Sequence, residues 1–247
     1  MKLSKLEPKF IDKHNPRVGL ITLASDFRIE KDFNNLIYDK DIDLYSNRIN
    51  SYNPLTNETL KKMAEDIPKV TENILPNQKL DCVAYGCTSG TIAAGYQSIY
   101  DKVNLAKPNT KVTTPITSAI NALKKLNIKK ISIFTPYTDE INQAVINYFK
   151  KENIEIVELS YFNIASDLDI GKVDSSHLFD VLVKKDLSKS DALFISCTAL
   201  PALSIINDLE KKLGKLVLSS NQTLIWDTLK QINFKSKIVG YGELFNN

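Results

Sequence analysis

The chain has 247 residues and a net charge of +3, with 43% hydrophobic and 25% charged residues. These values are typical of a soluble globular protein built as one large α/β domain or two small ones. The lysines form no basic stripe interleaved with aromatic residues, and no apolar run reaches the roughly 18–20 residues needed to span a bilayer. We therefore expect neither a nucleic-acid partner nor a membrane association.

The N-terminal residues and the cysteine count indicate a cytoplasmic protein without metal. Residues 1–17 are polar and lack the apolar stretch of a signal peptide. Three cysteines in a chain of this size do not form a disulfide framework. The two histidines, His14 and His177, are isolated, and the sequence contains no HExxH or CxxC motif. We expect no metal and no organic cofactor.

Strand and helix patterns alternate along nearly the whole chain. The predicted strands are 17–24, 41–49, 81–87, 111–115, 129–136, 154–162, 191–197 and 215–220. The predicted helices are 56–75, 91–103, 116–127, 138–153, 175–187, 200–214 and 222–233. Such alternation predicts an α/β fold in which helices flank parallel sheets. No glycine-rich phosphate-binding motif accompanies the pattern.

The order of these units repeats. DCVAYGCTSGTIAAGY matches DALFISCTALPALSII, and the strand before each and the unit after each match as well. The matched pairs are Cys87 with Cys197, 110 residues apart, Lys111 with Lys215, 104 apart, and Gly19 with Ile131, 112 apart. Three collinear matches predict two pseudo-symmetric, doubly wound α/β halves with an active-site cleft between them. We assign residues 17–115 with 221–247 to the first half, which the last helix and a final strand complete, and 116–220 to the second.

Cys87 and Cys197 end equivalent strands, where ligands bind in parallel α/β sheets. Each is followed by Thr and residues that can begin a helix, so each sulfur is expected at a helix N-terminus, which lowers the pKa of a thiol. A lone cysteine is more often a buried hydrophobic residue. The matched pair favours catalysis, whereas Cys82, which has no counterpart in the second half, is assigned to the core.

Two opposed thiols suit two related reactions. One thiolate can remove a proton from a carbon acid while the thiol on the other face supplies one, which inverts the carbon. Alternatively, one thiolate adds to an activated double bond and the other group protonates the neighbouring carbon, which leads to cis–trans isomerisation. Both schemes need donors that hold a carboxylate and stabilise the enolate-like charge. The donors expected beside the two cysteines are Thr88, Ser89, Thr198 and Ala199.

Further substrate-binding candidates follow the other strands. They are Ser25, Asp26, Pro115 and Tyr137, together with Asp167 in a loop whose position the sequence does not fix. Ser25 and Asp26 could equally cap a helix at 32–37, and Tyr137 could be a half-buried residue with a solvated hydroxyl. Asn221 and Gln222 are better explained as a cap of the last helix. Arg48, at the end of the second strand, could bind an anion or form a structural ion pair.

The two Cys-Thr motifs, GCTSGT and SCTALP, resemble those of the aspartate/glutamate racemase superfamily. The segments RVGLITLASD, VAYGCTSGTIAAG, TTPITSAINALKKL and FTPYTDEIN resemble the branch of maleate cis–trans isomerases, arylmalonate decarboxylases and racemase-like ectoine-utilisation proteins, most of all the last. The resemblance spans about residues 17–240. It implies a cofactor-independent site between two halves, a homodimer, Cys87 and Cys197 as the acid–base pair, and Tyr137 as a ligand of the substrate carboxylate.

Two departures from the branch bear on the activity. Where maleate isomerases have Asn after the first strand and again later, this sequence has Ser25-Asp26 and Asp167. An Asp there would repel a dicarboxylate unless it is protonated. The decarboxylases of the branch keep only the second cysteine, so the presence of both disfavours decarboxylation. We expect a racemase or epimerase of an amino-acid-like compound, or a cis–trans isomerase of a small unsaturated diacid. The alternatives are an arylmalonate-type decarboxylase and a non-catalytic protein that binds small carboxylates.

Overall fold

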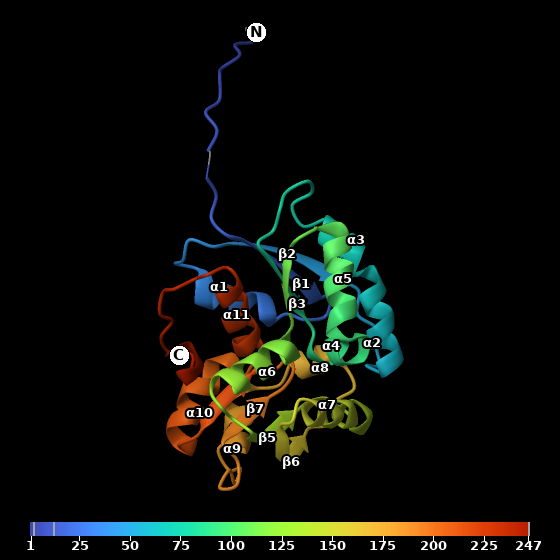
Figure 1. The fold of residues 1–247 in the computed structure, drawn as a ribbon, viewed down its shortest axis with the longest axis vertical. Helices are drawn as coiled ribbons and strands as arrows, with labels where there is room; N and C mark the ends of the chain where they lie inside the picture. The colour runs from blue at the N-terminus through green and yellow to red at the C-terminus, as the bar shows by residue number, and fades with distance from the viewer. Residues whose placement is uncertain (2, 12, 247) are drawn as a thin grey trace.

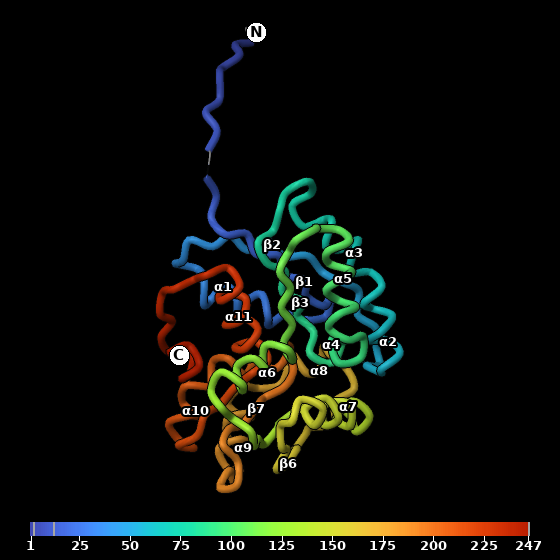
Figure 2. The backbone as a smooth tube through the Cα atoms, in the orientation of Figure 1, coloured from blue at the N-terminus to red at the C-terminus, as the bar shows by residue number. Residues whose placement is uncertain are grey.

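The computed structural model describes residues 1, 3–11 and 13–246. The N-terminal segment projects from a body that begins near Arg17 (Figures 1 and 2). The strands are β1 (Arg17–Leu23), β2 (Asp43–Ile49), β3 (Cys82–Gly86), β4 (Lys111–Thr113), β5 (Lys130–Thr135), β6 (Glu155–Tyr161), β7 (Ala192–Ile195) and β8 (Leu216–Ser219). The helices are α1 (Ile29–Ile37), α2 (Asn57–Met63), α3 (Ile67–Glu72), α4 (Thr88–Ala94), α5 (Tyr96–Ala106), α6 (Pro115–Lys125), α7 (Asp139–Lys151), α8 (Asp167–Gly171), α9 (Ser175–Leu182), α10 (Ile206–Leu213) and α11 (Ser220–Gln231).

The strands form two parallel sheets with the same topology. The first has the order β2-β1-β3-β4 and the second the order β6-β5-β7-β8. Helices flank both sheets, and Figure 1 shows α4, α6 and α8 at the level where the two sheets meet. The central strands are apolar and buried, as expected for parallel strands covered on both faces. The predicted α/β fold with two parallel sheets is confirmed.

The repeat extends to the hydrogen bonds that open the strands. The Asp81 carboxylate accepts the N–H of Arg17 at 2.8 Å, and the Asp191 carboxylate accepts the N–H of Lys130 at 3.1 Å. The strand pairing makes Val18 equivalent to Ile131 and Lys111 equivalent to Leu216, because these residues pair with equivalent positions of β3 and β7. Two of the three sequence matches were therefore misaligned by one residue, while the match of the cysteines is unchanged.

The last helix packs against the first half of the chain. α11 lies against β3 and β4 and runs beside α6. The buried Asp227 carboxylate of α11 accepts hydrogen bonds from Ser118 and Asn121 of α6, at 2.9 and 3.0 Å. The contacts with β3 and β4 support our proposal that residues 17–115 with 221–247 form one half, whereas the contacts with α6 join α11 to the segment 116–220 that we assign to the other half. The last of these residues, Asn247, lies outside the described part of the chain.

Three local predictions were wrong. The helix predicted at 56–75 is divided by a 3₁₀ turn (Ala64–Asp66) just before Pro68, which has no N–H to continue the first helix. The helix predicted at 91–103 is interrupted at Gly95, whose φ of 84° is outside the helical region. No strand follows β8 in the described residues, where the chain instead ends in a 3₁₀ helix (Glu243–Asn246).

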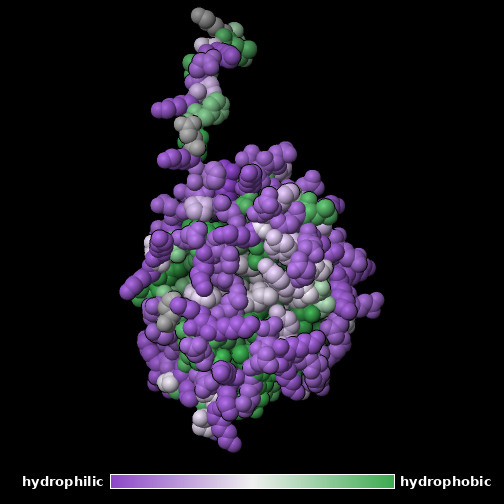
Figure 3. Space-filling view, viewed as in Figure 1, coloured by the Kyte–Doolittle hydropathy of each residue, from purple (hydrophilic) through white to green (hydrophobic). Residues whose placement is uncertain are grey.

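The face in Figure 3 is mostly hydrophilic, with hydrophobic residues in scattered groups. Across residues 1, 3–11 and 13–246, no helix combines the length and the apolar character needed to cross a bilayer.

Candidate active site

Cys87 lies where β3 passes into α4. Its backbone is extended, and its side chain caps the helix, because Sγ accepts the N–H of Gly90 at 3.2 Å. The hydroxyl of Ser89 lies 3.9 Å from the same sulfur. The side chain is only 4% exposed. The predicted position of this cysteine, at a strand end and a helix N-terminus, is confirmed.

Cys197 follows β7, but its surroundings differ from those of Cys87. Its φ is 101°, and residues 198–202 form turns rather than a helix. Its N–H donates to the hydroxyl oxygen of Ser220, in α11, at 3.0 Å. The prediction of a helix N-terminus was wrong here, because Pro201 has no N–H and helical structure begins only at the 3₁₀ turn Leu203–Ile205. The sulfur instead receives the N–H of Ala199.

Hydrogen bonds between the halves bring the two cysteines into one buried site. Thr88 Oγ1 donates to Ser220 Oγ at 2.9 Å, so one serine joins the segments that follow both cysteines. Thr198 Oγ1 donates to the carbonyl of Gly86 at 3.2 Å. Tyr137, 2% exposed, lies close to Cys197 and within electrostatic range of both cysteines. Both cysteines therefore lie buried at the junction of the halves, within electrostatic range of Tyr137.

The thiol pKa values are raised, contrary to the sequence prediction. Burial raises the pKa of Cys87 to about 12 and that of Cys197 well above its ordinary value. The carboxylates of Asp167 and Asp26 raise both further, whereas the N–H of Gly90 at Cys87 and the N–H of Ala199 at Cys197 oppose the shift. The contribution of the helix N-terminus is present at Cys87, but desolvation outweighs it.

Three predicted acidic and hydroxyl residues gather beside the thiols. Ser25 Oγ donates to the carboxylate of Asp167 at 2.6 Å, across the junction of the halves. Asp167 begins α8, and burial raises its pKa to about 6. Asp26 accepts the N–H groups of Arg28 and Ile29 through Oδ1, at 2.7 and 3.1 Å, so it caps the start of α1 as well as facing the site.

Other candidates have structural roles in this conformation. The hydroxyl hydrogens of Thr88 and Thr198 are committed to the contacts between halves, so their role as donors to a substrate stays a prediction. Pro115 is the first residue of α6, and its carbonyl accepts a long bond from Thr223 at 3.5 Å. Arg48 pairs with Glu30 and donates to the carbonyl of Asp26 at 2.7 Å. It therefore forms a structural ion pair, the alternative to anion binding.

Comparison with known proteins identifies the family. A model of the arylmalonate decarboxylase family matches residues 64–245. The chain belongs to the arylmalonate decarboxylase family. Its relatives include a maleate isomerase from Geobacillus stearothermophilus, 26% identical over 93% of this chain and 97% of that protein. An arylmalonate decarboxylase from Bordetella bronchiseptica is 28% identical over 54% of this chain and 57% of that protein.

A solved structure in the same group shares the fold. A Nocardia farcinica maleate cis–trans isomerase, in a Cys-to-Ser mutant with a covalently bound succinylcysteine intermediate, superposes with a TM-score of 0.85 at 18% identity. The superposition covers 93% of this chain and 98% of that one. The family match and the maleate isomerase and decarboxylase relatives confirm the predicted superfamily branch, although the family contains more than one activity.

The sequence prediction missed several residues of this family member's site. Asn221 does not cap α11, because Ser219 does so in a capping box with Gln222. Asn221 Nδ2 instead donates to Asp32 at 2.7 Å and to the carbonyl of Thr198 at 2.8 Å. Tyr85, buried on β3, places its hydroxyl next to Cys87. The signal for Tyr85 was its position two residues before Cys87, which puts both side chains on one face of the extended chain.

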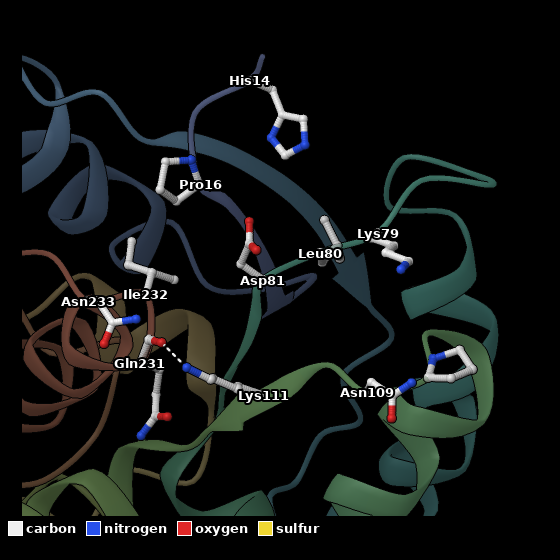
Figure 4. A pocket seen from close by; sticks show the side chains of 11 residues that line it. His14, Pro16, Lys79, Leu80, Asp81, Asn109, Lys111, Gln231, Ile232 and Asn233 are labelled. Atoms are coloured by element: carbon white, nitrogen blue, oxygen red, sulfur yellow. Dashed lines mark hydrogen bonds between the residues drawn. The ribbon is translucent and has the colours of Figure 1, made fainter. Parts of the chain in front are cut away.

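A cavity lies at the end of the first sheet opposite to Cys87. It has a volume of about 470 Å³ and is lined by residues near the amino ends of β1, β3 and β4, including His14, Lys79, Asp81 and Lys111. Figure 4 shows Lys111 bonded to the carbonyl of Gln231 in this cavity. The cysteines follow the carboxyl ends of β3 and β7, so this cavity is separate from the candidate active site.

Gly90 offers a direct test of how closely Cys87 is held. A Cβ at this position would lie 2.8 Å from Cys87 Sγ and 2.9 Å from the Tyr85 hydroxyl. We expect Gly90→Ala to displace the sulfur and lower kcat about 10- to 100-fold, because small misplacements of a reacting group are costly. Gly95→Ala is the matched control. Its Cβ would meet nothing within 4 Å, so the substitution acts through its positive φ alone, and we expect a loss of about 1–3 kcal/mol of stability with little change in kcat.

Proposed function

We propose that the protein is a cofactor-independent isomerase of a small carboxylate, with Cys87 and Cys197 as its acid–base or nucleophile–acid pair. The observation that supports this most is the placement of both sulfurs, from equivalent strand ends, in one buried site with Tyr137 beside them. Similarity to maleate isomerases over nearly the whole chain supports the same conclusion. A cytoplasmic location and a homodimer remain predictions.

The site supplies what either isomerisation needs. In a racemisation, one thiolate takes the proton of the carbon next to the carboxylate, and the thiol on the other face returns a proton to that carbon. In a cis–trans isomerisation, one sulfur bonds to a double-bond carbon and the other thiol protonates the neighbouring carbon. Rotation and the reverse elimination then free the first sulfur. Contacts with Gly90 at Cys87, and with Ala199 and Tyr137 at Cys197, oppose the burial that raises the pKa of each thiol.

Decarboxylation is the second candidate function, because of the family and the relative from Bordetella bronchiseptica. It requires one thiol to protonate a carbanion after carbon dioxide leaves. The presence of a second buried cysteine beside the first favours isomerisation instead. A protein that binds carboxylates without turnover is the remaining alternative.

Incubation of small carboxylates with the enzyme in D₂O separates these functions. We expect the wild type to introduce deuterium next to a carboxylate, or to interconvert cis and trans isomers, as NMR spectra would show. Release of carbon dioxide from a substituted malonate without isomerisation of any acid would favour the decarboxylase. Binding of an acid without exchange, conversion or gas release would favour the binding protein.

A further inference from the structure

Carboxyl groups lie among the hydroxyls of Ser89, Tyr85 and Tyr137 around the thiols. Asp26 and Asp167 lie within electrostatic range of both sulfurs, and Asp32 lies within range of Asp26. Asp26 is 1% exposed and Asp167 is 4% exposed. In the described part of the chain, no group of three or more His, Cys, Asp or Glu is arranged to hold a metal ion. The cluster therefore needs another explanation.

Two buried acceptor oxygens in this region have no hydrogen-bond partner, and the hydroxyls of Tyr85 and Ser196 have none either. Asp26 Oδ2 is one. The hydroxyl of Thr198 lies nearby, but it donates its hydrogen to the carbonyl of Gly86 instead. Asn221 Oδ1 is the other, and its side chain is 2% exposed. The amide of Asn221 cannot be turned around, because its nitrogen donates to the carboxylate of Asp32 and to a carbonyl. Both free groups are acceptors, and an unsatisfied buried acceptor is costly.

The neighbouring arginines do not pair with these carboxyl groups. The Arg28 guanidinium donates to the carbonyl of Gly171 at 2.7 and 3.0 Å. Arg48 pairs with Glu30 and with backbone carbonyls. Among the ion pairs of the described residues, none involves Asp26, Asp32 or Asp167. The site thus has buried carboxyl groups and free acceptors, but no side-chain cation of its own in direct contact.

We propose that Asp26, Asp167 and Asn221 form a subsite for an ammonium group of the substrate, next to the two thiols. This inference rests on the proposed function and specifies its substrate class as an amino acid or a similar zwitterion. An ammonium group has three N–H donors and a positive charge, which match the free acceptors and the carboxylates. A diacid without nitrogen would add negative charge beside buried carboxyl groups, at a cost in binding free energy.

Matched ligands test the subsite. Calorimetry with the full-length wild-type enzyme would compare aspartate, glutamate and alanine with succinate, glutarate and propionate, which lack only the amino group, and with maleate. We expect at least one amino acid to bind at least tenfold more tightly than its nitrogen-free partner. Binding of the ammonium should also release protons near pH 6–7, because a cation lowers the pKa of the neighbouring carboxyls.

Two conservative variants and one control locate the effect. Asp26→Asn keeps the oxygen that caps α1, and Asp167→Asn keeps an acceptor for Ser25. Each should weaken amino-acid binding about 10- to 100-fold without weakening nitrogen-free acids. Glu30→Gln removes a nearby charge that is paired with Arg48 and should leave the ratio of the two affinities unchanged. Either aspartate variant suffices if the other fails to fold.

The outcomes separate this inference from the proposed function. Equal or tighter binding of the nitrogen-free acids, or no binding of any amino acid, would overturn the subsite, even if maleate is isomerised. An amino acid that binds through Asp26 and Asp167 but exchanges no proton in D₂O would support the subsite and contradict the isomerase.

Discussion

Replacement of Cys87 or Cys197 by serine is expected to lower kcat about 10²- to 10⁴-fold. A serine hydroxyl has nearly the same size as a thiol, but it is a much weaker acid, and it forms the anion needed for proton removal or addition far less readily. Because the two sulfurs act in succession on one substrate, the double variant should be little worse than the worse single variant. Steady-state kinetics on the substrate identified in D₂O would measure these effects.

Cys82 provides the internal control for this series. It begins β3, is fully buried, and lies 3.9 Å from the hydroxyl of Thr113. Cys82→Ser should change stability but leave kcat near the wild-type value. Substantial turnover by Cys87→Gly, with carbon dioxide as a product, would contradict the isomerase and favour the one-cysteine decarboxylase chemistry.

The acidic cluster is expected to make the folded protein less stable as the pH rises. Burial raises the pKa of Asp167 from 3.8 to about 6 and that of the partly buried Asp32 from 3.8 to about 7. The folded state therefore holds protons that the unfolded state has released. Stability from this source is fully present below about pH 4 and is lost as the pH rises to about 7. For Asp167 alone the loss is on the order of 3 kcal/mol.

Urea unfolding at about pH 5 and about pH 8 would measure this loss. Asp167→Asn keeps the size of the side chain and an acceptor for Ser25, but it cannot ionise. We expect the variant to be more stable than the wild type at pH 8, with a smaller advantage at pH 5. Free energies of unfolding that differ by the same amount at both pH values would show that the carboxyl is not destabilised by burial.

The parts of the fold that the sequence predicted are those fixed by local patterns. Apolar runs that alternate with amphipathic segments predicted the parallel strands. Asp81 and Asp191 match in the repeat because each binds a backbone N–H at the start of the neighbouring strand. The positions of Cys87 and Cys197 at strand ends followed from the same pattern. Breaks within helices followed single residues, Pro68 and Gly95, whose effects depend on packing that the pattern does not contain.

The parts of the site that were not predicted depend on contacts between distant segments. The loop after Cys197 is held by Ser220 of α11 rather than by a helix of its own. Asp32 and Asn221 are 189 residues apart and meet only in the folded chain. The thiol pKa values were mispredicted for the same reason. A sequence shows where a helix N-terminus lies, but it does not show complete desolvation or neighbouring carboxylates.

A crystal structure with a bound substrate or unreactive analogue would test the central claim most directly, through the positions of Cys87 Sγ and Cys197 Sγ. We predict that the two sulfurs contact opposite faces of the same carbon, or of neighbouring carbons, with Tyr137 at the carboxylate. Proton transfer requires such direct approach, so sulfurs more than about 10 Å apart around the bound ligand would contradict the paired mechanism.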